Sequence, residues 1–263
     1  MSDELEHNLV LLKLHHLAAN LADFIARATK ARLGPREIIA EIARIEAMDR
    51  QERTTARRLK DAKIGRFKPL ADYDWAWPKQ IDREAIDRIA ALDFLTDDAN
   101  VILAGPQGVG KTMIVKNVAH AAILAGHTAL VTTASQLVID LAQQESSRSL
   151  QARIRTYLRP DLLVIDEIGY LSFDSRAADL LFEVVSRRYE NGSVLLTTNL
   201  AFKDWATIFP GAACVTAMID RLTHHAEILA IDADSYRHRE SKERQQRKQP
   251  NKPKRKGQGD EKK

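Results

Sequence analysis

The chain has 263 residues, a formal net charge of +4, 44% hydrophobic and 29% charged residues, values typical of a globular protein with a real core. No run approaches the ~18 apolar residues of a membrane span, so we expect no membrane partner. The acidic N-terminus, MSDELEHN, does not resemble a secretory signal. The single cysteine, Cys214, excludes an intramolecular disulfide, fits a reducing cytoplasm and is interpreted as structural.

Three helices are predicted before residue 64. In the first two, apolar residues recur at helical spacing, and the second opens at Gly34 and Pro35, a common helix start. The apolar residues are Leu14, Leu17, Leu21, Phe24 and Ile25 in the first helix, and Ile38, Ile39, Ile42 and Ile45 in the second.

The third helix carries cations at intervals of three and four residues, which places them on one side of it. The stripe is Arg50, Arg53, Arg57 and Lys60, and the nearby Arg58 and Lys63 extend the positive charge. Glu46, Glu52 and Asp61 interleave, as they would on an ordinary solvated face. We favour a phosphate-contacting surface because the stripe is continuous. The DNA-binding residues expected are therefore these six cations.

Two segments have unusual composition. Residues 67–80, FKPLADYDWAWPKQ, predict a linker that lies against the next domain, with aromatics that either pack or line a pocket for a base. Residues 237–263 are rich in Arg, Lys, Gln and Pro and bury too little apolar surface to order themselves. This tail is either a solubilising segment or a non-specific nucleic-acid arm.

From about Asn100 the pattern alternates short apolar strands with amphipathic helices. The strands are VILAG, HTALVTTA, LLVID, SVLLTTN and EILAIDA, and a helix before the fourth strand ends near Asn191 and Gly192. The unbroken apolar run of LLVID fits a strand that is buried on both faces. This alternation predicts an α/β sandwich built on a parallel sheet.

The clearest motif is the loop GPQGVGKT at residues 105–112, between the first strand and a helix. Glycines let backbone N–H groups turn inward around phosphates, and the helix adds the positive end of its dipole. Lys111 would reach the β and γ phosphates, and Thr112 would ligate Mg²⁺. The nucleotide-binding residues expected here are Gly105, Pro106, Gln107, Gly108, Val109, Gly110, Lys111, Thr112 and Met113.

LLVIDE places Asp166 and Glu167 at the carboxyl end of a buried strand, where ligands bind in open α/β sheets. We expect Asp166 to hold Mg²⁺ and Glu167 to polarise a water for attack on the γ phosphate. Two solvated acids at a strand end are the alternative, but adjacent like charges are unfavourable without a role. An attacking water indicates hydrolysis rather than transfer to a metabolite.

Other polar residues have more than one interpretation. Asn199 would either bond the attacking water or serve as a turn residue. Arg221 and Arg237 suit the charge of a transferring phosphoryl group, in their own subunit or in a neighbour. The pairs His15–His16 and His224–His225 lack an accompanying Cys or carboxylate motif in the sequence, so we do not expect a metal there.

These motifs resemble those of the IstB-like ATPases, transposition helper proteins of bacterial insertion sequences within the AAA+ superfamily, related to DnaC and DnaA. The resemblance runs from about Leu9 to Arg237 and rests on GPQGVGKT, LLVIDEIGYL, RRYE, LLTTN, MIDRLTHHAEIL and SYR. The tail falls outside it, and Gln107, Val109 and TTN replace residues that are common in relatives without removing any chemical group.

The resemblance implies that Lys111 and Thr112 are Walker A residues, Asp166 and Glu167 the Walker B pair, and Asn199 a sensor. Arg221 would be an arginine finger that reaches a neighbour's ATP, and Arg237 a second arginine near that interface. It implies ATP and Mg²⁺ as cofactors, and double-stranded DNA, a transposase and further copies of the chain as partners. The implied domains are helical at 1–66, a linker at 67–80, AAA+ at 81–237 and a basic tail at 238–263.

Two other functions remain as hypotheses. A helicase loader would use the N-terminal helices to grip a helicase and would prefer single-stranded DNA. A small-molecule kinase would need a mobile lid with arginines and a substrate pocket, for which the sequence offers no separate segment.

Overall fold

The computed structural model describes residues 2–169, 173–209, 213–233 and 236. Its centre is a five-stranded sheet in the order β2-β3-β4-β1-β5, and all neighbouring strands are parallel. The strands are β1 (Asn100–Ala104), β2 (Ala129–Thr133), β3 (Leu162–Ile168), β4 (Ser193–Thr198) and β5 (Ala226–Ala230). Their carboxyl ends therefore meet at one edge, which positions the loops that follow β1, β3 and β4 together.

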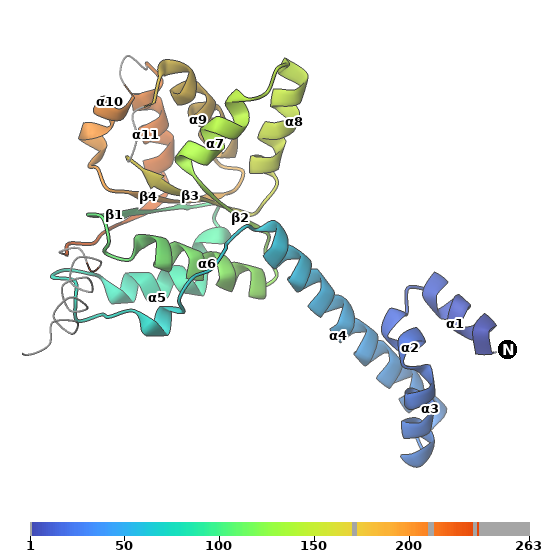
Figure 1. Ribbon diagram of the computed structural model, residues 1–263. Helices are drawn as coiled ribbons and strands as arrows, with labels where there is room; N and C mark the ends of the chain where they lie inside the picture. The colour runs from blue at the N-terminus through green and yellow to red at the C-terminus, as the bar shows by residue number, and fades with distance from the viewer. Residues whose placement is uncertain (1, 170–172, 210–212, 234–235, 237–263) are drawn as a thin grey trace, which may run out of the picture.

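Helices cover both faces of the sheet (Figure 1). One face carries α5 (Arg83–Ala91) and α6 (Lys111–Leu124). The other carries α7 (Ala134–Ala142), α8 (Ser147–Leu158), α9 (Ser175–Arg188), α10 (Trp205–Ile208) and α11 (Val215–Thr223). Short 3-10 turns lie at η1 (Leu70–Asp72), η2 (Asp93–Leu95) and η3 (Phe202–Asp204).

The core forms two layers because successive side chains of a strand point to opposite faces. In β3, Leu162 and Val164 pack with the α5–α6 layer, whereas Leu163 and Ile165 pack with the α7–α11 layer. Burial on both faces explains the unbroken apolar run of this strand, as predicted. The half-buried Cys214 packs against the α7–α11 layer. Burial raises the pKa of its thiol, and a hydrogen bond with Asp179 raises it further.

The N-terminal helices differ from the prediction. The chain forms α1 (Ser2–Leu11), α2 (His15–Ala19) and α3 (Leu21–Lys30), so the expected first helix is interrupted at Asn20. The expected second and third helices are one helix, α4 (Pro35–Asp61), of 27 residues. No glycine or proline interrupts residues 36–61, so the change from apolar to basic composition does not end the helix.

In Figure 1, α4 projects from the sheet domain and carries α1–α3 at its far end. Leu17 and Phe24 pack on Ile38, Ile42 and Ile45 of α4, while Ile25 and Ile39 are exposed, contrary to the predicted apolar faces. The buried Glu46 accepts a hydrogen bond from the Leu17 N–H at 2.6 Å, which fixes α2 on α4. Within the described residues no helix is both long and apolar enough to cross a membrane.

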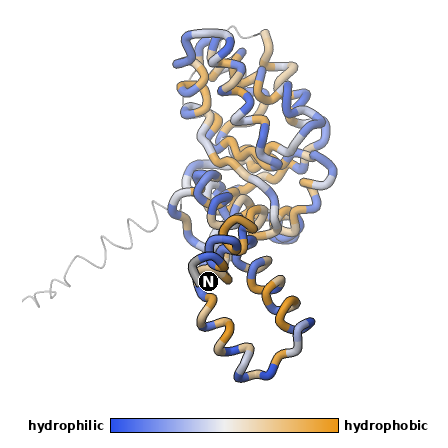
Figure 2. Tube along the Cα trace, turned by 90° about the vertical axis from the view of Figure 1, so that its right-hand side faces the viewer, coloured by the Kyte–Doolittle hydropathy of each residue, from blue (hydrophilic) through white to orange (hydrophobic). Residues whose placement is uncertain are grey.

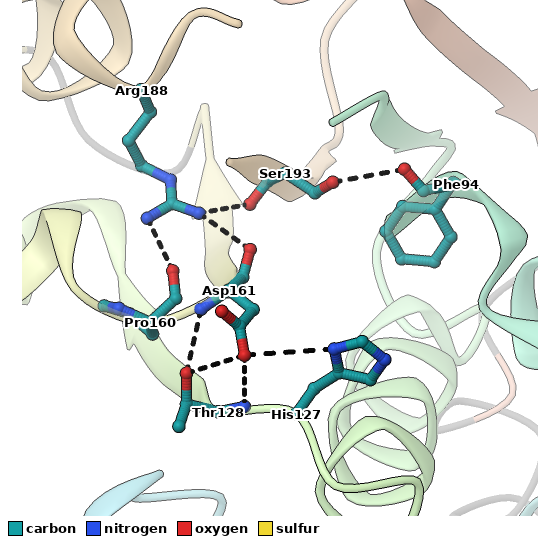
Figure 3. Close-up of polar contacts among 7 residues, drawn as sticks. All are labelled: Phe94, His127, Thr128, Pro160, Asp161, Arg188 and Ser193. Atoms are coloured by element: carbon teal, nitrogen blue, oxygen red, sulfur yellow. Dashed lines mark hydrogen bonds and ion pairs between the residues drawn. The ribbon is translucent and has the colours of Figure 1, made fainter. Parts of the chain in front are cut away.

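Arg188 ties together the amino ends of the strands (Figure 3). Its side chain is 1% exposed and donates to the carbonyls of Pro160, Asp161 and Ser193 at 2.8–3.0 Å. Burial lowers the pKa of its guanidinium to about 10. Asp161 in turn accepts from Thr128 N at 2.7 Å, so β2, β3 and β4 begin in register. The Arg188 of the RRYE motif is therefore a structural residue.

Candidate nucleotide site

The glycine loop at residues 105–112 joins β1 to α6 at the carboxyl edge of the sheet. Gly108 and Gly110 have φ angles of 79° and 97°, which residues with a side chain rarely adopt. A Cβ on Gly105 would lie 2.4 Å from the carbonyl oxygen of Ile231, the residue that follows β5, so this close approach requires glycine. The loop therefore needs glycine at these positions, and phosphate binding there stays a prediction.

Lys111 begins α6, and its side chain is almost fully buried at 6% exposure. Its Nζ donates to the carbonyl oxygens of Gly105 at 2.6 Å and Pro106 at 2.8 Å. The ammonium therefore lies inside the loop, where backbone carbonyl oxygens take the place of water as its hydrogen-bond acceptors. An anion that enters the loop would compete with these carbonyls for the same cation.

Asp166 and Glu167 lie where β3 pairs irregularly with β4. The register runs from Ile165 opposite Leu196 to Ile168 opposite Thr198, so two residues of β3 oppose Thr197 alone. Glu167 has φ 65°, a left-handed conformation that is uncommon outside glycine. Such a bulge redirects side chains, and both acids line the same two cavities instead of pointing to opposite faces.

Thr197 organises this bulge, and sequence analysis did not single it out. Its buried hydroxyl accepts from Glu167 N at 2.8 Å and donates to the Asp166 carboxylate. One hydroxyl therefore fixes the backbone of one acid and the carboxylate of the other. Its place two residues before Asn199 was the available signal in the sequence.

We expect Thr197→Val to lower the rate of any hydrolysis at this site roughly tenfold, because Glu167 loses the bond that holds its backbone. Nucleotide affinity measured without Mg²⁺ should change by less than about threefold, since the glycine loop itself is untouched. Steady-state kinetics with a binding titration would separate the two, and Thr207→Val, a change at an exposed threonine, is the matched control. An unchanged rate would contradict the role of Thr197.

Two connected cavities surround the loop and the acids. One, of about 280 Å³, is lined by Arg66, Phe67 and Lys68 of the linker together with the loop, Asp166 and Glu167. The other, of about 480 Å³, extends past Thr112 toward α7 and α8. Thr112, Lys116, Asp166 and Glu167 line both. A hydroxyl, cations and two carboxylates thus converge at the mouth of the glycine loop.

Asn199 directly follows β4, but it is not among the residues that line these two cavities. Its Oδ1 is buried without a hydrogen-bond partner among the described residues. A Cβ on Gly169 would lie 2.3 Å from this oxygen, so Gly169 leaves room for the amide. The sensor role of Asn199 stays a prediction.

Arg221 lies at the opposite edge of the sheet. Its carbonyl oxygen accepts from Asn100, the first residue of β1, whereas the glycine loop follows the last residue of that strand. A strand of this length spans about 16 Å. The guanidinium lies 4.8 Å from the Phe182 ring, and its Nη1 has no hydrogen-bond partner among the residues described. Arg237 lies outside the described residues, as does the tail at 238–263.

The basic residues of α4 and of the turn after it divide into two groups. Arg50, Arg53 and Arg57 are exposed and line one cavity of about 460 Å³, together with Lys13 and His15. Lys60 is also exposed, as the stripe requires. Arg58 lies near Gly126, and Lys63 lines the cavity beside Thr112, so these two are directed toward the sheet domain.

The histidine pairs differ from each other. His16 lies 4.0 Å from Asp49, and His15 lines the cavity beside the stripe. His224 and His225 gather with Glu190, with ligand atoms within 4.8 Å, so a carboxylate does accompany this pair, contrary to the sequence interpretation. All three are exposed, and the Tyr189 hydroxyl bonds His224 Nδ1 at 2.8 Å.

Comparison with known protein families shows which family this chain belongs to. The family described as IstB-like ATP binding protein matches residues 7–244. The chain belongs to this IstB-like family. It is 35% identical over 239 residues to an IS21 insertion-sequence ATP-binding protein of Pseudomonas aeruginosa, covering 91% of this chain and 90% of that one. It is 32% identical to an IS5376 ATP-binding protein of Geobacillus stearothermophilus over 78% and 82% of the two chains.

Solved structures agree on the fold of this IstB-like chain. The DnaI crystal structure matches with a TM-score of 0.54 at 18% identity, over 64% of this chain and 93% of that one. A replication initiator DnaA, bound to AMPPCP and single-stranded DNA, matches with a TM-score of 0.50 at 16% identity over 67% and 56%. The predicted α/β sandwich built on a parallel sheet is confirmed.

Proposed function

We propose that this IstB-like chain is an ATPase that assembles on double-stranded DNA and assists a partner transposase. The observation that carries the proposal is the convergence of Lys111, Thr112, Asp166 and Glu167 on one cavity at the mouth of a glycine loop. The names of the insertion-sequence relatives, which are ATP-binding proteins, support the choice of nucleotide.

Each residue at the loop has a distinct part in this proposal. The backbone N–H groups of the loop and the start of α6 bind the phosphates, and Lys111 leaves its carbonyl partners to neutralise the β and γ phosphates. Glu167, held by Thr197, accepts a proton from the water that attacks the γ phosphate. The products are then ADP and phosphate.

The same site suits Mg²⁺. Asp166 is a carboxylate at 4% exposure that lines both cavities with the Thr112 hydroxyl, and oxygen ligands of this kind are those Mg²⁺ prefers. A bound Mg²⁺ would neutralise charge on the phosphate oxygens. Thr112 and Asp166 would hold it, and the bond from Thr197 would keep the Asp166 carboxylate aimed at it.

Arg221 completes the site of a neighbouring copy in this proposal. It lies one strand length from the glycine loop of its own chain, so it would meet nucleotide only across a head-to-tail interface. Its buried Nη1 without a partner suits a group that acquires one on assembly. Figure 2 shows hydrophobic segments along the N-terminal helices. In this region Leu11, Leu12 and Ile39 are 66–69% exposed and offer a second contact between copies.

The cationic side of α4 is the proposed DNA contact. Arg50, Arg53 and Arg57 form one exposed group on a helix that projects from the ATPase domain (Figure 1). Arg53 is held by Asp49 at 2.7 Å, which leaves Arg50 and Arg57 as the stronger candidates for phosphate contacts. Because α4 projects from the sheet domain, an oligomer would present many such helices to one duplex.

The proposal is tested by DNA binding of the full-length protein with ATP, with ADP and without nucleotide. We expect duplex binding to strengthen with ATP and Mg²⁺, to weaken as salt rises and to exceed binding to single strands. Arg50→Ser with Arg57→Ser should reduce the slope of log affinity against log salt by roughly two. Arg44→Ser, on the same helix but paired with Glu41, is the matched control.

Binding that is independent of nucleotide would contradict the proposal, and preference for single strands would favour a helicase loader instead. The transposase is tested separately. A transposase of the element that encodes this chain should be retained on DNA only with ATP-bound protein, and failure of that step alone would restrict the function to DNA assembly.

A further inference from the structure

The linker after α4 contacts the glycine loop directly. Tyr73 is 9% exposed, and its hydroxyl donates to the Val109 carbonyl oxygen at 2.8 Å. Its ring also covers Gly110, where a Cβ would lie 2.5 Å from Tyr73 Cε2. One side chain from outside the loop thus contacts two consecutive loop residues, Val109 and Gly110.

This hydrogen bond fixes the orientation of one peptide plane. The Val109 carbonyl and the Gly110 N–H belong to the same trans peptide and point in opposite directions. Because the carbonyl is held toward Tyr73, the Gly110 N–H is directed away from the Tyr73 side chain, and Gly110 itself lines the cavity of about 280 Å³. Burial, and then Asp74, raise the pKa of Tyr73 to about 12, so the hydroxyl remains a donor at neutral pH.

The linker is itself anchored, so the hydroxyl has a defined position. Asn117 of α6 accepts from Leu70 N and donates to the Lys68 carbonyl, both at 2.9 Å. The ring of Trp75 lies 4.7 Å from that of Tyr73, and Arg83 lies over Trp75 at 4.9 Å. These contacts order Tyr73 before any ligand binds, which lowers the entropy that binding must offset.

We propose that Tyr73 is a positioning residue for phosphate binding, which pre-orients the Gly110 N–H and makes the linker a determinant of nucleotide affinity. The inference rests on the proposed function, in which this loop binds ATP. Thermodynamic linkage makes this coupling reciprocal. If the ordered linker strengthens ATP binding, bound ATP must stabilise the ordered linker by the same free energy. The segment that begins where α4 ends would therefore respond to nucleotide.

The test uses the full-length protein and two readouts. Tyr73→Phe keeps the ring and removes only the hydroxyl, so we expect ATP to bind roughly fivefold more weakly, the effect of one hydrogen bond. The KM for ATP should rise by a similar factor with kcat unchanged. Tyr189→Phe, which removes a hydroxyl at the opposite edge of the sheet, should leave ATP affinity unchanged.

Hydrogen exchange supplies the second readout, with no dependence on activity. In the wild type, ATP should slow exchange in peptides that cover residues 67–80, and Tyr73→Phe should lose most of this protection. Equal ATP affinity in folded Tyr73→Phe, or linker exchange that ignores ATP in the wild type, would overturn the inference while leaving the proposed function intact. Absence of ATP binding by the wild type would overturn both.

Discussion

Lys111→Ala is expected to weaken ATP binding by at least ~100-fold. The ammonium makes two contacts inside the loop at 2.6 and 2.8 Å, and with nucleotide it would make charge-assisted bonds to the β and γ phosphates instead. Each such bond contributes roughly 1.5–3 kcal/mol, so their joint loss corresponds to two or more orders of magnitude in affinity. Titration of a fluorescent ATP analogue measures this directly.

The fold should survive this change, because the loop conformation depends on its glycines and on Tyr73 as well as on Lys111. Thermal unfolding checks that point. Lys203→Ala removes an exposed lysine from η3 and should leave affinity unchanged. Affinity of Lys111→Ala within threefold of the wild type would mean that the phosphates bind elsewhere.

Glu167→Gln is expected to separate binding from hydrolysis. The amide keeps the size of the side chain but cannot accept a proton, so kcat should fall by roughly 10²–10⁴-fold. ATP affinity should stay within about threefold, since Thr197 bonds the backbone N–H of Glu167 rather than its side chain. The ATP-bound oligomer should then persist on duplex DNA, which competition with unlabelled duplex would show as slow release.

Glu145→Gln, at an exposed position before α8, is the matched control for this measurement. If the Glu167→Gln variant hydrolysed ATP at the wild-type rate, another group would be the base. The left-handed backbone of Glu167, with φ 65°, would then need a different explanation.

The sequence predicted the sheet domain well because its signals are local. An unbroken apolar run is sufficient to identify β3, and the glycine spacing is sufficient to identify the loop before α6. The N-terminal helices were less predictable. Residues 36–61 change from apolar to basic without a backbone signal. The first half of α4 packs on α2 and α3, whereas the second half exposes the cationic stripe and ends against the sheet domain, where Leu59 packs on the α5–α6 layer.

What the sequence could not predict depends on neighbouring strands and on distant segments. Thr197 acts on Asp166 and Glu167 only because β4 pairs with β3 around a bulge, and strand order cannot be read from spacing. Tyr73 and Val109 are 36 positions apart in the sequence, so their hydrogen bond could not be predicted. From the sequence, the aromatic residues of the linker could be interpreted only as packing or as the wall of a pocket. The separation of Arg221 from the loop likewise follows from which end of β1 it contacts.

The central claim is that ATP is held between two copies of the chain, by the loop of one and Arg221 of the next. Its most direct test mixes two variants, Lys111→Ala and Arg221→Ala, each expected to be inactive alone on duplex DNA with ATP. In a 1:1 mixture, about a quarter of head-to-tail interfaces would join an intact loop to an intact Arg221, so hydrolysis should recover to about a quarter of the wild-type rate. No recovery in mixed oligomers, or full hydrolysis by Arg221→Ala alone, would contradict the account.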